Sequence, residues 1–403
     1  MTDIFRAYFD ARKHKRNTKS QLAFEMELEH NLVTLYEQIT NRTYRPSPCC
    51  CFITEYPVKR EIFASSFRDR VIHHLLFNYI APLFERQMIF DSYSCRIGKG
   101  TMQGIDRFEH HIRSCTDNYT CDAYILKLDL KGYFMSIDKE RLYDIIRRTI
   151  DRCGNRPSGD GRTWDERIDF GLVDFLLRTI LFRNPVKGCH VIGSRSDWDG
   201  LPPSKSLLFS LPGIGLPIGD LTSQLFSNIY LDVLDEYVKR ELGCRHYGRY
   251  VDDFYIVHPR RSYLRELIPR LRDFLADELR LTLHPDKIVL LHHAKGASFL
   301  GAVVRPHRRY PAKRTAGMFR TAIRTLEREC LSGEPPAERL AEMLAVINSY
   351  CGHLRHFKAY RILSGQFGKS PLKRYFYFDP DYRKAKIKRE YKPKTIMNVN
   401  GKQ

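Results

Sequence analysis

The chain has 403 residues, and its 67 lysine and arginine side chains exceed its 47 aspartate and glutamate side chains by a formal charge of +20. A hydrophobic fraction of 43% is enough to build a core, which excludes wholesale disorder. We find no run of about 18 apolar residues and no apolar signal-peptide core, so we expect neither a membrane span nor secretion. Eleven cysteines without a Cys-x-x-Cys pair indicate a reducing cytosol. We interpret the consecutive Cys49, Cys50 and Cys51 as small apolar residues.

The positive charge is concentrated in two clusters. One consists of Arg305, Arg308, Arg309, Lys313 and Arg314. The other lies near the C-terminus and consists of Arg383, Lys384, Lys386, Lys388, Arg389, Lys392 and Lys394. Because each neutralised phosphate releases counterions, such clusters favour a nucleic-acid partner. A solvated basic arm is the alternative for the second cluster.

Apolar periodicity and turn residues predict the following elements in chain order. We expect helices over 1–46, a strand or hairpin over 50–65, a helix over 67–90, a turn at 98–100, a helix over 101–111, a strand over 123–129, a helix near 168–182, a helix over 220–242, a hairpin over 246–258, a helix near 262–279, a strand near 297–304 and helices over 315–367 with a break at 332–336. Apart from its one helix, the stretch 153–215 is rich in Gly, Pro, Ser and Asp, which predicts a long surface excursion.

Three carboxylates carry the strongest chemical signal. Asp129 ends an apolar strand, and the predicted tip of the 246–258 hairpin holds Asp252 and Asp253 between strand-forming residues. Adjacent carboxylates repel each other unless a cation lies between them, and a hard ion such as Mg²⁺ prefers oxygen ligands. Carboxylates from neighbouring strands can hold two metal ions, which is the chemistry of nucleotidyl transfer. The alternatives are an ordinary turn for the Asp-Asp pair and a strand-end cap for Asp129.

At this point the sequence resembles the reverse transcriptases. Tyr250-Val251-Asp252-Asp253 is similar to their YxDD box, and residues 129–134 resemble their first catalytic motif in the form used by group II intron and retron enzymes. Further boxes follow in the family's order at 59–62, 68–70, 90–98, 283–287 and 299–301, so that the resemblance covers about residues 50–305.

The resemblance implies an α+β right-hand polymerase, with an antiparallel palm sheet backed by helices. The fingers are then expected from 1–115 and from an insertion at about 140–210, the palm within 116–305, a helical thumb over 306–370 and a basic tail over 371–403.

One box indicates a subfamily. Where most reverse transcriptases carry a Gln-Gly pair followed by Ser-Pro, this chain has the aliphatic Ile218 before Gly219, and Gln224 replaces the proline. The departure resembles the reverse transcriptases of diversity-generating retroelements, as do residues 198–206 and 348–353. That resemblance implies a cytoplasmic enzyme, encoded by a bacterium or a phage, which copies a template-repeat RNA into cDNA for a variable gene. It also implies an accessory protein that forms a basic homopentamer.

The resemblance assigns metal-binding and catalytic roles residue by residue. Asp129, Asp252, Asp253 and the carbonyl of Leu130 would hold two Mg²⁺ ions, with Mn²⁺ as a possible substitute. Lys287 would protonate the departing pyrophosphate, although a phosphate-neutralising or solvated lysine is an equal alternative.

The nucleotide site is assigned in the same way. Arg60 would stack over the incoming base with Lys59 beside it, and the backbone of Gly132 and Tyr133 would bind the triphosphate. Phe134 would be the steric gate against a 2′-hydroxyl, with a core phenylalanine as the alternative. The remaining dNTP-binding positions are Ile218, Gly219 and Gln224. Nucleic-acid contacts are expected at Arg70, Tyr250, Leu300, Gly301, Arg305, His353, Lys388 and Arg389.

Ile218 has a physical consequence of its own. An aliphatic side chain cannot form the hydrogen bond of the usual Gln, and selection by shape is weaker than selection by hydrogen bonds. We therefore predict relaxed fidelity, and the resemblance implies that errors occur opposite template adenines.

Two other functions stay open at this point. One is a retron-like or phage-defence reverse transcriptase, and the other is a catalytically inert RNA-binding scaffold. A zinc site at His353 and His356 has little support, because no full ligand set accompanies them; the paired histidines are expected to contact RNA, cap or pack.

Overall fold

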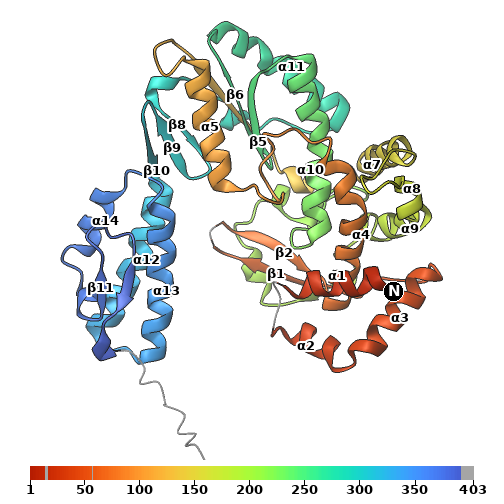
Figure 1. Ribbon diagram of the computed structural model, residues 1–403, viewed down its shortest axis with the longest axis horizontal. Coiled ribbons are helices and arrows are strands. Elements are labelled where there is room, and N and C mark those ends of the chain that lie inside the picture. Colours follow the sequence, from red (N-terminus) through yellow and green to blue (C-terminus); the bar gives the residue numbers. More distant parts are fainter. Residues whose placement is uncertain (14–16, 57, 392–403) are drawn as a thin grey trace, which may run out of the picture. The chain divides into compact units, whose positions relative to one another are not determined.

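The computed structural model describes residues 1–13, 17–56 and 58–391. It divides the chain into two compact units, each built from two segments (Figure 1). Unit 1 comprises Met1–Arg107 and Ile125–Leu290, and unit 2 comprises Phe108–Tyr124 and Leu291–Gln403. The boundaries of these two units differ from those expected for fingers, palm and thumb. That division therefore stays a prediction.

Unit 1 begins with a helical layer, as predicted. Its helices are α1 (Thr2–Arg12), α2 (Lys19–Met26), α3 (Leu28–Thr40) and α4 (Phe67–Glu85). The Ser66 side chain caps α4 by accepting from the Asp69 N–H, at 3.2 Å. Helix α4 packs against both α1 and α10 (Leu221–Glu236), so its apolar residues lie at the centre of the unit.

The chain forms part of a small sheet between α3 and α4. Strands β1 (Cys50–Thr54) and β2 (Arg60–Ala64) form the predicted antiparallel hairpin, from Cys50 opposite Ala64 to Thr54 opposite Arg60. A third strand, β4 (His190–Val191), pairs with β1 in parallel. This pairing corrects the prediction for 153–215. That stretch is no mere surface excursion, because β4 joins the sheet and Ser206 and Leu207 are buried.

The second sheet has the strand order β5-β6-β3-β7. Its strands are β3 (Tyr124–Asp129), β5 (His246–Tyr250), β6 (Asp253–His258) and β7 (Val289–His292). Strands β5 and β6 form the predicted antiparallel hairpin, but Tyr250 pairs with Asp253, so the tip consists of Val251 and Asp252. Asp253 is therefore the first residue of β6 rather than part of the tip. Helix α11 (Arg261–Leu279) packs against β6.

Short helices fill the rest of unit 1. They include α6 (Tyr133–Ser136), α7 (Lys139–Cys153), α8 (Trp164–Arg167) and α9 (Phe170–Leu181), and α5 (Thr101–Cys115) runs from this unit into unit 2. The predicted helix over 220–242 is α10 followed by one π-helical turn at Tyr237–Glu241.

Unit 2 combines a small sheet with helices. The sheet has the order β10-β9-β8, and its strands are β8 (Ala297–Phe299), β9 (Ala302–Arg305) and β10 (Arg308–Pro311). The predicted single strand over 297–304 is wrong, because Leu300 and Gly301 have φ angles of 49° and 82° and turn the chain between β8 and β9. Two consecutive positive φ angles are the requirement of the tightest hairpin turns.

The helices of unit 2 match the prediction closely. They are α12 (Lys313–Ser332), α13 (Ala337–Leu354) and α14 (Tyr360–Phe367), with the break after Ser332. The described part of the predicted basic tail is folded, since β11 (Phe376–Phe378) and β12 (Ala385–Ile387) pair and Asn348 exchanges hydrogen bonds with the backbone of Ala385. Lys392 and Lys394 lie outside the described residues. Among the helices of those residues, none combines the length and apolarity that crossing a bilayer requires.

Candidate active site

The three predicted carboxylates lie at the ends of neighbouring strands. Strand β3 is anchored by buried Ile125, Leu126 and Leu128 and ends at the half-buried Asp129. Its neighbour β6 begins at Asp253, directly after Asp252 in the turn. The structure thus brings together residues that are more than a hundred positions apart in the sequence.

The turn that carries Asp252 is held by a buried ion pair. Val251 has a φ angle of 54°, which a β-branched residue adopts only under strain of about 1–3 kcal/mol. The guanidinium of Arg249 donates to the Val251 carbonyl at 3.1 Å and to both oxygens of Asp235, at 2.6 and 2.8 Å. Arg249 and Asp235 are both fully buried. A bidentate pair of this kind has a fixed geometry, so it fixes the turn.

Sequence reasoning missed this pair. The signal was an arginine inside a predicted hairpin strand, between the aromatic Tyr247 and the β-branched Val251. A buried cation requires an anionic partner, and Asp235 is the partner, which also accepts from the hydroxyl of Tyr247 at 2.5 Å.

The carboxylates perturb one another. The pKa of Asp252 is raised to about 6, first by burial and then by the negative charge of Asp129. Burial also raises the pKa of Asp253, although the ammonium group of Lys127, with its Nζ 3.4 Å from Asp253 Oδ1, opposes this. Lys127 was missed as well. It lies two residues before Asp129 on β3, so strand alternation places it on the same face.

Lys287 lies beside Asp129, and its predicted role as a proton donor stays a prediction. Its Nζ is 2.8 Å from Asp129 Oδ1. Backbone bonds bring the two segments together, since the His284 N–H donates to the Asp129 carbonyl at 2.8 Å and the Lys131 N–H donates to Thr282 at 2.9 Å. The side chain of Lys287 is about half exposed, so this ion pair can exchange for other partners.

The donor chemistry of the carboxylates fits a hard divalent cation. All of the side-chain atoms that could coordinate a metal are carboxylate oxygens. A bound cation would also offset the cost of keeping neighbouring buried carboxylates ionised. Within residues 1–13, 17–56 and 58–391, no group of three or more His, Cys, Asp and Glu side chains forms a ready-made metal cage. Lys127 and Lys287 are the cations that contact these carboxylates here.

The predicted triphosphate-binding turn follows β3. Gly132 has a φ angle of 58° and is the N-cap residue of α6, and a Cβ at this position would lie 2.7 Å from the carbonyl oxygen of Ser204. Only glycine fits such a position. The ring of Tyr133 is buried, and its hydroxyl donates to the Ser227 carbonyl at 2.5 Å, so the side chain is fixed in the core; the triphosphate role of its backbone stays a prediction.

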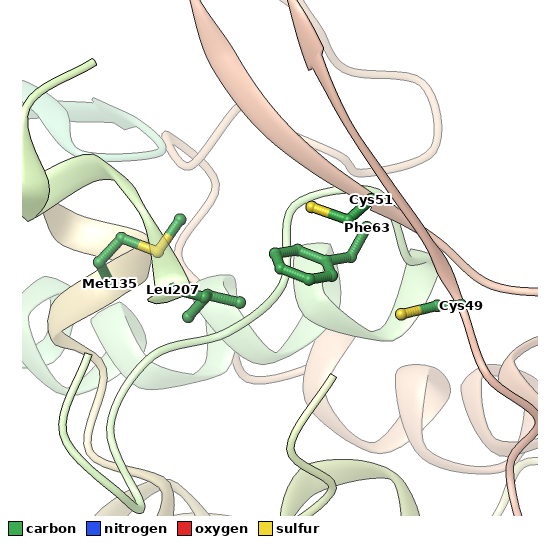
Figure 2. Packing of buried hydrophobic residues seen from close by; sticks show 5 residues of the cluster. All are labelled: Cys49, Cys51, Phe63, Met135 and Leu207. Carbon is green, nitrogen blue, oxygen red and sulfur yellow. The ribbon is translucent and has the colours of Figure 1, made fainter. Parts of the chain in front are cut away.

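Phe134 and Ile218 pack against the same apolar cluster. The cluster consists of Cys49, Cys51, Phe63, Met135 and Leu207, and Figure 2 shows how these side chains lie together. Both Phe134 and Ile218 are only partly buried against it, so each keeps an open face. Burial raises the pKa of the Cys49 thiol to about 11 and that of Cys51 to about 12, so both are neutral apolar side chains, as predicted.

Comparison with known proteins identifies part of this architecture. Residues 210–304 match the family described as reverse transcriptase (RNA-dependent DNA polymerase). The chain carries a reverse transcriptase domain. This domain indicates an RNA-directed DNA polymerase.

Similar proteins include one curated relative and several solved structures. Protein YkfC of Escherichia coli (strain K12) is 22% identical over 333 residues, which cover 74% of this chain and 76% of the relative. A telomerase of Candida albicans, solved with a TWJ fragment of telomeric RNA, is 12% identical with a TM-score of 0.46, over 85% of this chain and 61% of that chain. Apo telomerase of Candida Tropicalis is 10% identical with a TM-score of 0.47, over 80% of this chain and 60% of that chain. The chain therefore spans about three-fifths of the length of these telomerases.

The reverse transcriptase domain contains the Ile218–Gln224 box, the Asp252–Asp253 pair and Lys287, whereas Asp129 precedes it. A Cβ at Gly219, with a φ angle of 140°, would lie 2.2 Å from the carbonyl oxygen of Phe63. Gln224 is exposed on the first turn of α10.

The remaining predicted contacts divide between the units. In unit 1, Lys59 donates to the Asp199 carbonyl at 2.8 Å, and Arg60 beside it is exposed. Arg70 donates to the Ser65 carbonyl at 3.0 Å. Tyr250 is the last residue of β5. Unit 2 holds Leu300, Gly301, Arg305, His353, Lys388 and Arg389, whose nucleic-acid role stays a prediction. Two of the paired histidines pack as expected: buried His73 hydrogen-bonds Thr222, and buried His293 bonds Ala123.

Proposed function

We propose that this chain is an error-prone reverse transcriptase of a diversity-generating retroelement, which copies a template-repeat RNA into cDNA. The observation that carries the polymerase activity is the gathering of Asp129, Asp252 and Asp253 at adjoining strand ends. With the Leu130 carbonyl, these carboxylates would hold two Mg²⁺ ions. Bound there, the ions supply activation of the primer hydroxyl and stabilisation of the leaving oxygen.

The protein side chains then have distinct tasks. Lys287, whose Nζ lies 2.8 Å from Asp129 Oδ1, would give a proton to the leaving pyrophosphate. The strained turn at Val251, fixed by Arg249, holds Asp252 in place before the metal arrives. Preorganisation of this kind lowers the cost of assembling the site.

The choice of a diversity-generating retroelement rests on Ile218. Its side chain has no hydrogen-bonding group and packs on the apolar cluster, so the pocket selects nucleotides by shape at this position. The proposal includes dNTPs and template-repeat RNA as ligands, and an accessory homopentamer as partner. Errors are expected opposite template adenines.

The test is sequencing of cDNA made by the purified chain with Mg²⁺, dNTPs and a primed RNA template, with Asp252→Asn as the control. Errors concentrated at template adenines, and reduced in Ile218→Gln, are the expected result. Accurate cDNA from the parent would point instead to a retron-like or phage-defence enzyme. A chain that binds RNA but makes no DNA, even with the accessory protein and cognate RNA, would be an inert scaffold.

A further inference from the structure

A fully buried carboxylate joins strand β2 to the proline-containing segment before the reverse transcriptase box. Glu61 has no exposed surface. It accepts hydrogen bonds from Trp198 Nε1 at 2.8 Å, from Ser206 Oγ at 2.7 Å and from the Leu207 N–H at 2.7 Å. All three donors are neutral, so the carboxylate is stabilised only while the segment stays in place around it.

The segment from Trp198 to Leu207, which we call the strap, also contacts the predicted nucleotide site. Its Asp199 carbonyl accepts from Lys59, and its Ser204 carbonyl oxygen would lie only 2.7 Å from a Cβ at residue 132. Leu207 belongs to the apolar cluster, and Trp198 packs on it. The strap therefore touches the residues on which nucleotide binding is expected to depend.

Ile218 and Phe134, the two side chains expected to select the nucleotide, are held by backbone hydrogen bonds near β2 and the strap. The Phe63 N–H, two residues beyond Glu61 on β2, donates to the Ile218 carbonyl at 2.8 Å. The Leu216 N–H donates to the Phe134 carbonyl at 2.8 Å. A displacement of β2 relative to the strap would consequently move Ile218 and Phe134 relative to each other.

We propose that the strap, held by its three hydrogen bonds to Glu61, forms one wall of the nucleotide pocket. Its position sets the width of that pocket between Phe134 and Ile218. Glu61, Trp198 and Ser206 are positioning residues for nucleotide selection, and their ligand is the sugar and base of the incoming dNTP. The inference rests on the proposed function, because it assigns specificity to that same site. Selection by shape requires a rigid wall, and a buried carboxylate with three donors supplies one.

The chain offers a matched pair of substitutions, because it has only two tryptophans. Trp198→Phe keeps an aromatic ring on the apolar cluster but removes the N–H that bonds Glu61. Trp164→Phe is the control: its ring is buried beside Arg86 and Arg167, whose guanidinium carbons lie 5.4 and 5.5 Å from it. Ser206→Ala removes a second donor without changing the backbone.

The first measurement is single-nucleotide extension of a primed RNA template. In Trp198→Phe, we expect the ratio of kcat/KM for the correct dNTP to that for the ribonucleotide or a mismatched dNTP to fall about tenfold, which is the effect of losing one hydrogen bond to a charged acceptor. Trp164→Phe should keep the parental ratio. The selectivity ratio of the double variant Glu61→Gln/Trp198→Phe should be no more than about twofold below that of Glu61→Gln, because both substitutions act through one contact.

The second measurement does not depend on DNA synthesis. In Trp164→Phe, the remaining indole is Trp198, so its fluorescence reports on the wall. We expect dNTP to shift this emission, and Glu61→Gln in the same background to weaken the apparent dNTP affinity. If no form of the protein makes DNA but Trp198 emission still responds to dNTP, the proposed function is wrong. The inference that the strap borders a nucleotide-binding pocket is then still supported. Unaltered selectivity with a lowered melting temperature, or emission that ignores dNTP, would overturn the inference.

Discussion

Replacing Asp252 by asparagine is expected to stabilise the metal-free protein while abolishing DNA synthesis. The pKa of Asp252 is raised from 3.8 to about 6, by burial and by Asp129. At about 1.4 kcal/mol for each tenfold change in proton affinity, keeping this carboxylate ionised in the folded protein costs about 3 kcal/mol. Asparagine has nearly the same shape and no charge, so it removes that cost.

The sign of the pH dependence follows from the direction of the shift. Between about pH 4 and about pH 6 the folded protein binds more protons at Asp252 than the unfolded chain does, so stability falls as the pH rises. Above the folded pKa the cost is complete. The stability advantage of Asp252→Asn over the parent should therefore be largest near pH 8 and vanish below about pH 3.

Thermal and urea unfolding in a metal chelator measure this difference. Asp277→Asn, on the exposed face of α11, is a suitable control and should shift stability little at any pH. With Mg²⁺ at about one hundred times its dissociation constant, the parent should gain about 2.7 kcal/mol, and Asp252→Asn much less. An advantage of Asp252→Asn that is the same at pH 5 and pH 8 would refute the reasoning, because the charge would then not be its source.

Three further substitutions test other parts of the site. Phe134→Ala should raise ribonucleotide incorporation about tenfold or more, measured by alkali-sensitive cDNA, because the gate loses its volume; unchanged sensitivity would contradict that role. Asp235→Asn should cost about 3–5 kcal/mol in urea unfolding, since it leaves the buried Arg249 uncompensated; a loss below about 1 kcal/mol would show the pair to be dispensable. Gly219→Ala should abolish primer extension and lower stability by more than Gly213→Ala, which has an open surround and serves as the control; equal effects would mean that only φ matters.

The strap shows how much of the site depends on neighbours that are distant in the sequence. Glu61 and Trp198 are 137 residues apart, and nothing in either local pattern indicates that an indole N–H will meet that carboxylate. The enrichment of 153–215 in Gly, Pro, Ser and Asp led to the prediction of a surface excursion. The buried Ser206 and Leu207 show that proline-rich backbone can enter a core when its polar groups find partners.

Local chemistry alone was sufficient for many of the elements and for the position of Asp129 at the end of a strand. The apolar run before Asp129 predicted a strand that ends there, and the strand-forming residues around Asp252 predicted a hairpin, because side-chain period and β-branching act within a few residues. The same physics located the break between α12 and α13 at Ser332 and the proline-containing segment after it. It mislocated the hairpin tip by one residue and missed the turn at Leu300, since register and positive φ depend on the partner strand.

Only the tertiary structure decided how the charges are paired. Lys127 and Lys287 approach the carboxylates, and Arg249 finds Asp235, because strand order and helix packing bring these segments into contact. A buried charge must be paired, but the sequence does not say with which of many opposite charges. The physical reason is that hydrophobic periodicity is a local property of the chain, whereas the pairing of buried polar groups is a property of the contacts that the completed fold creates.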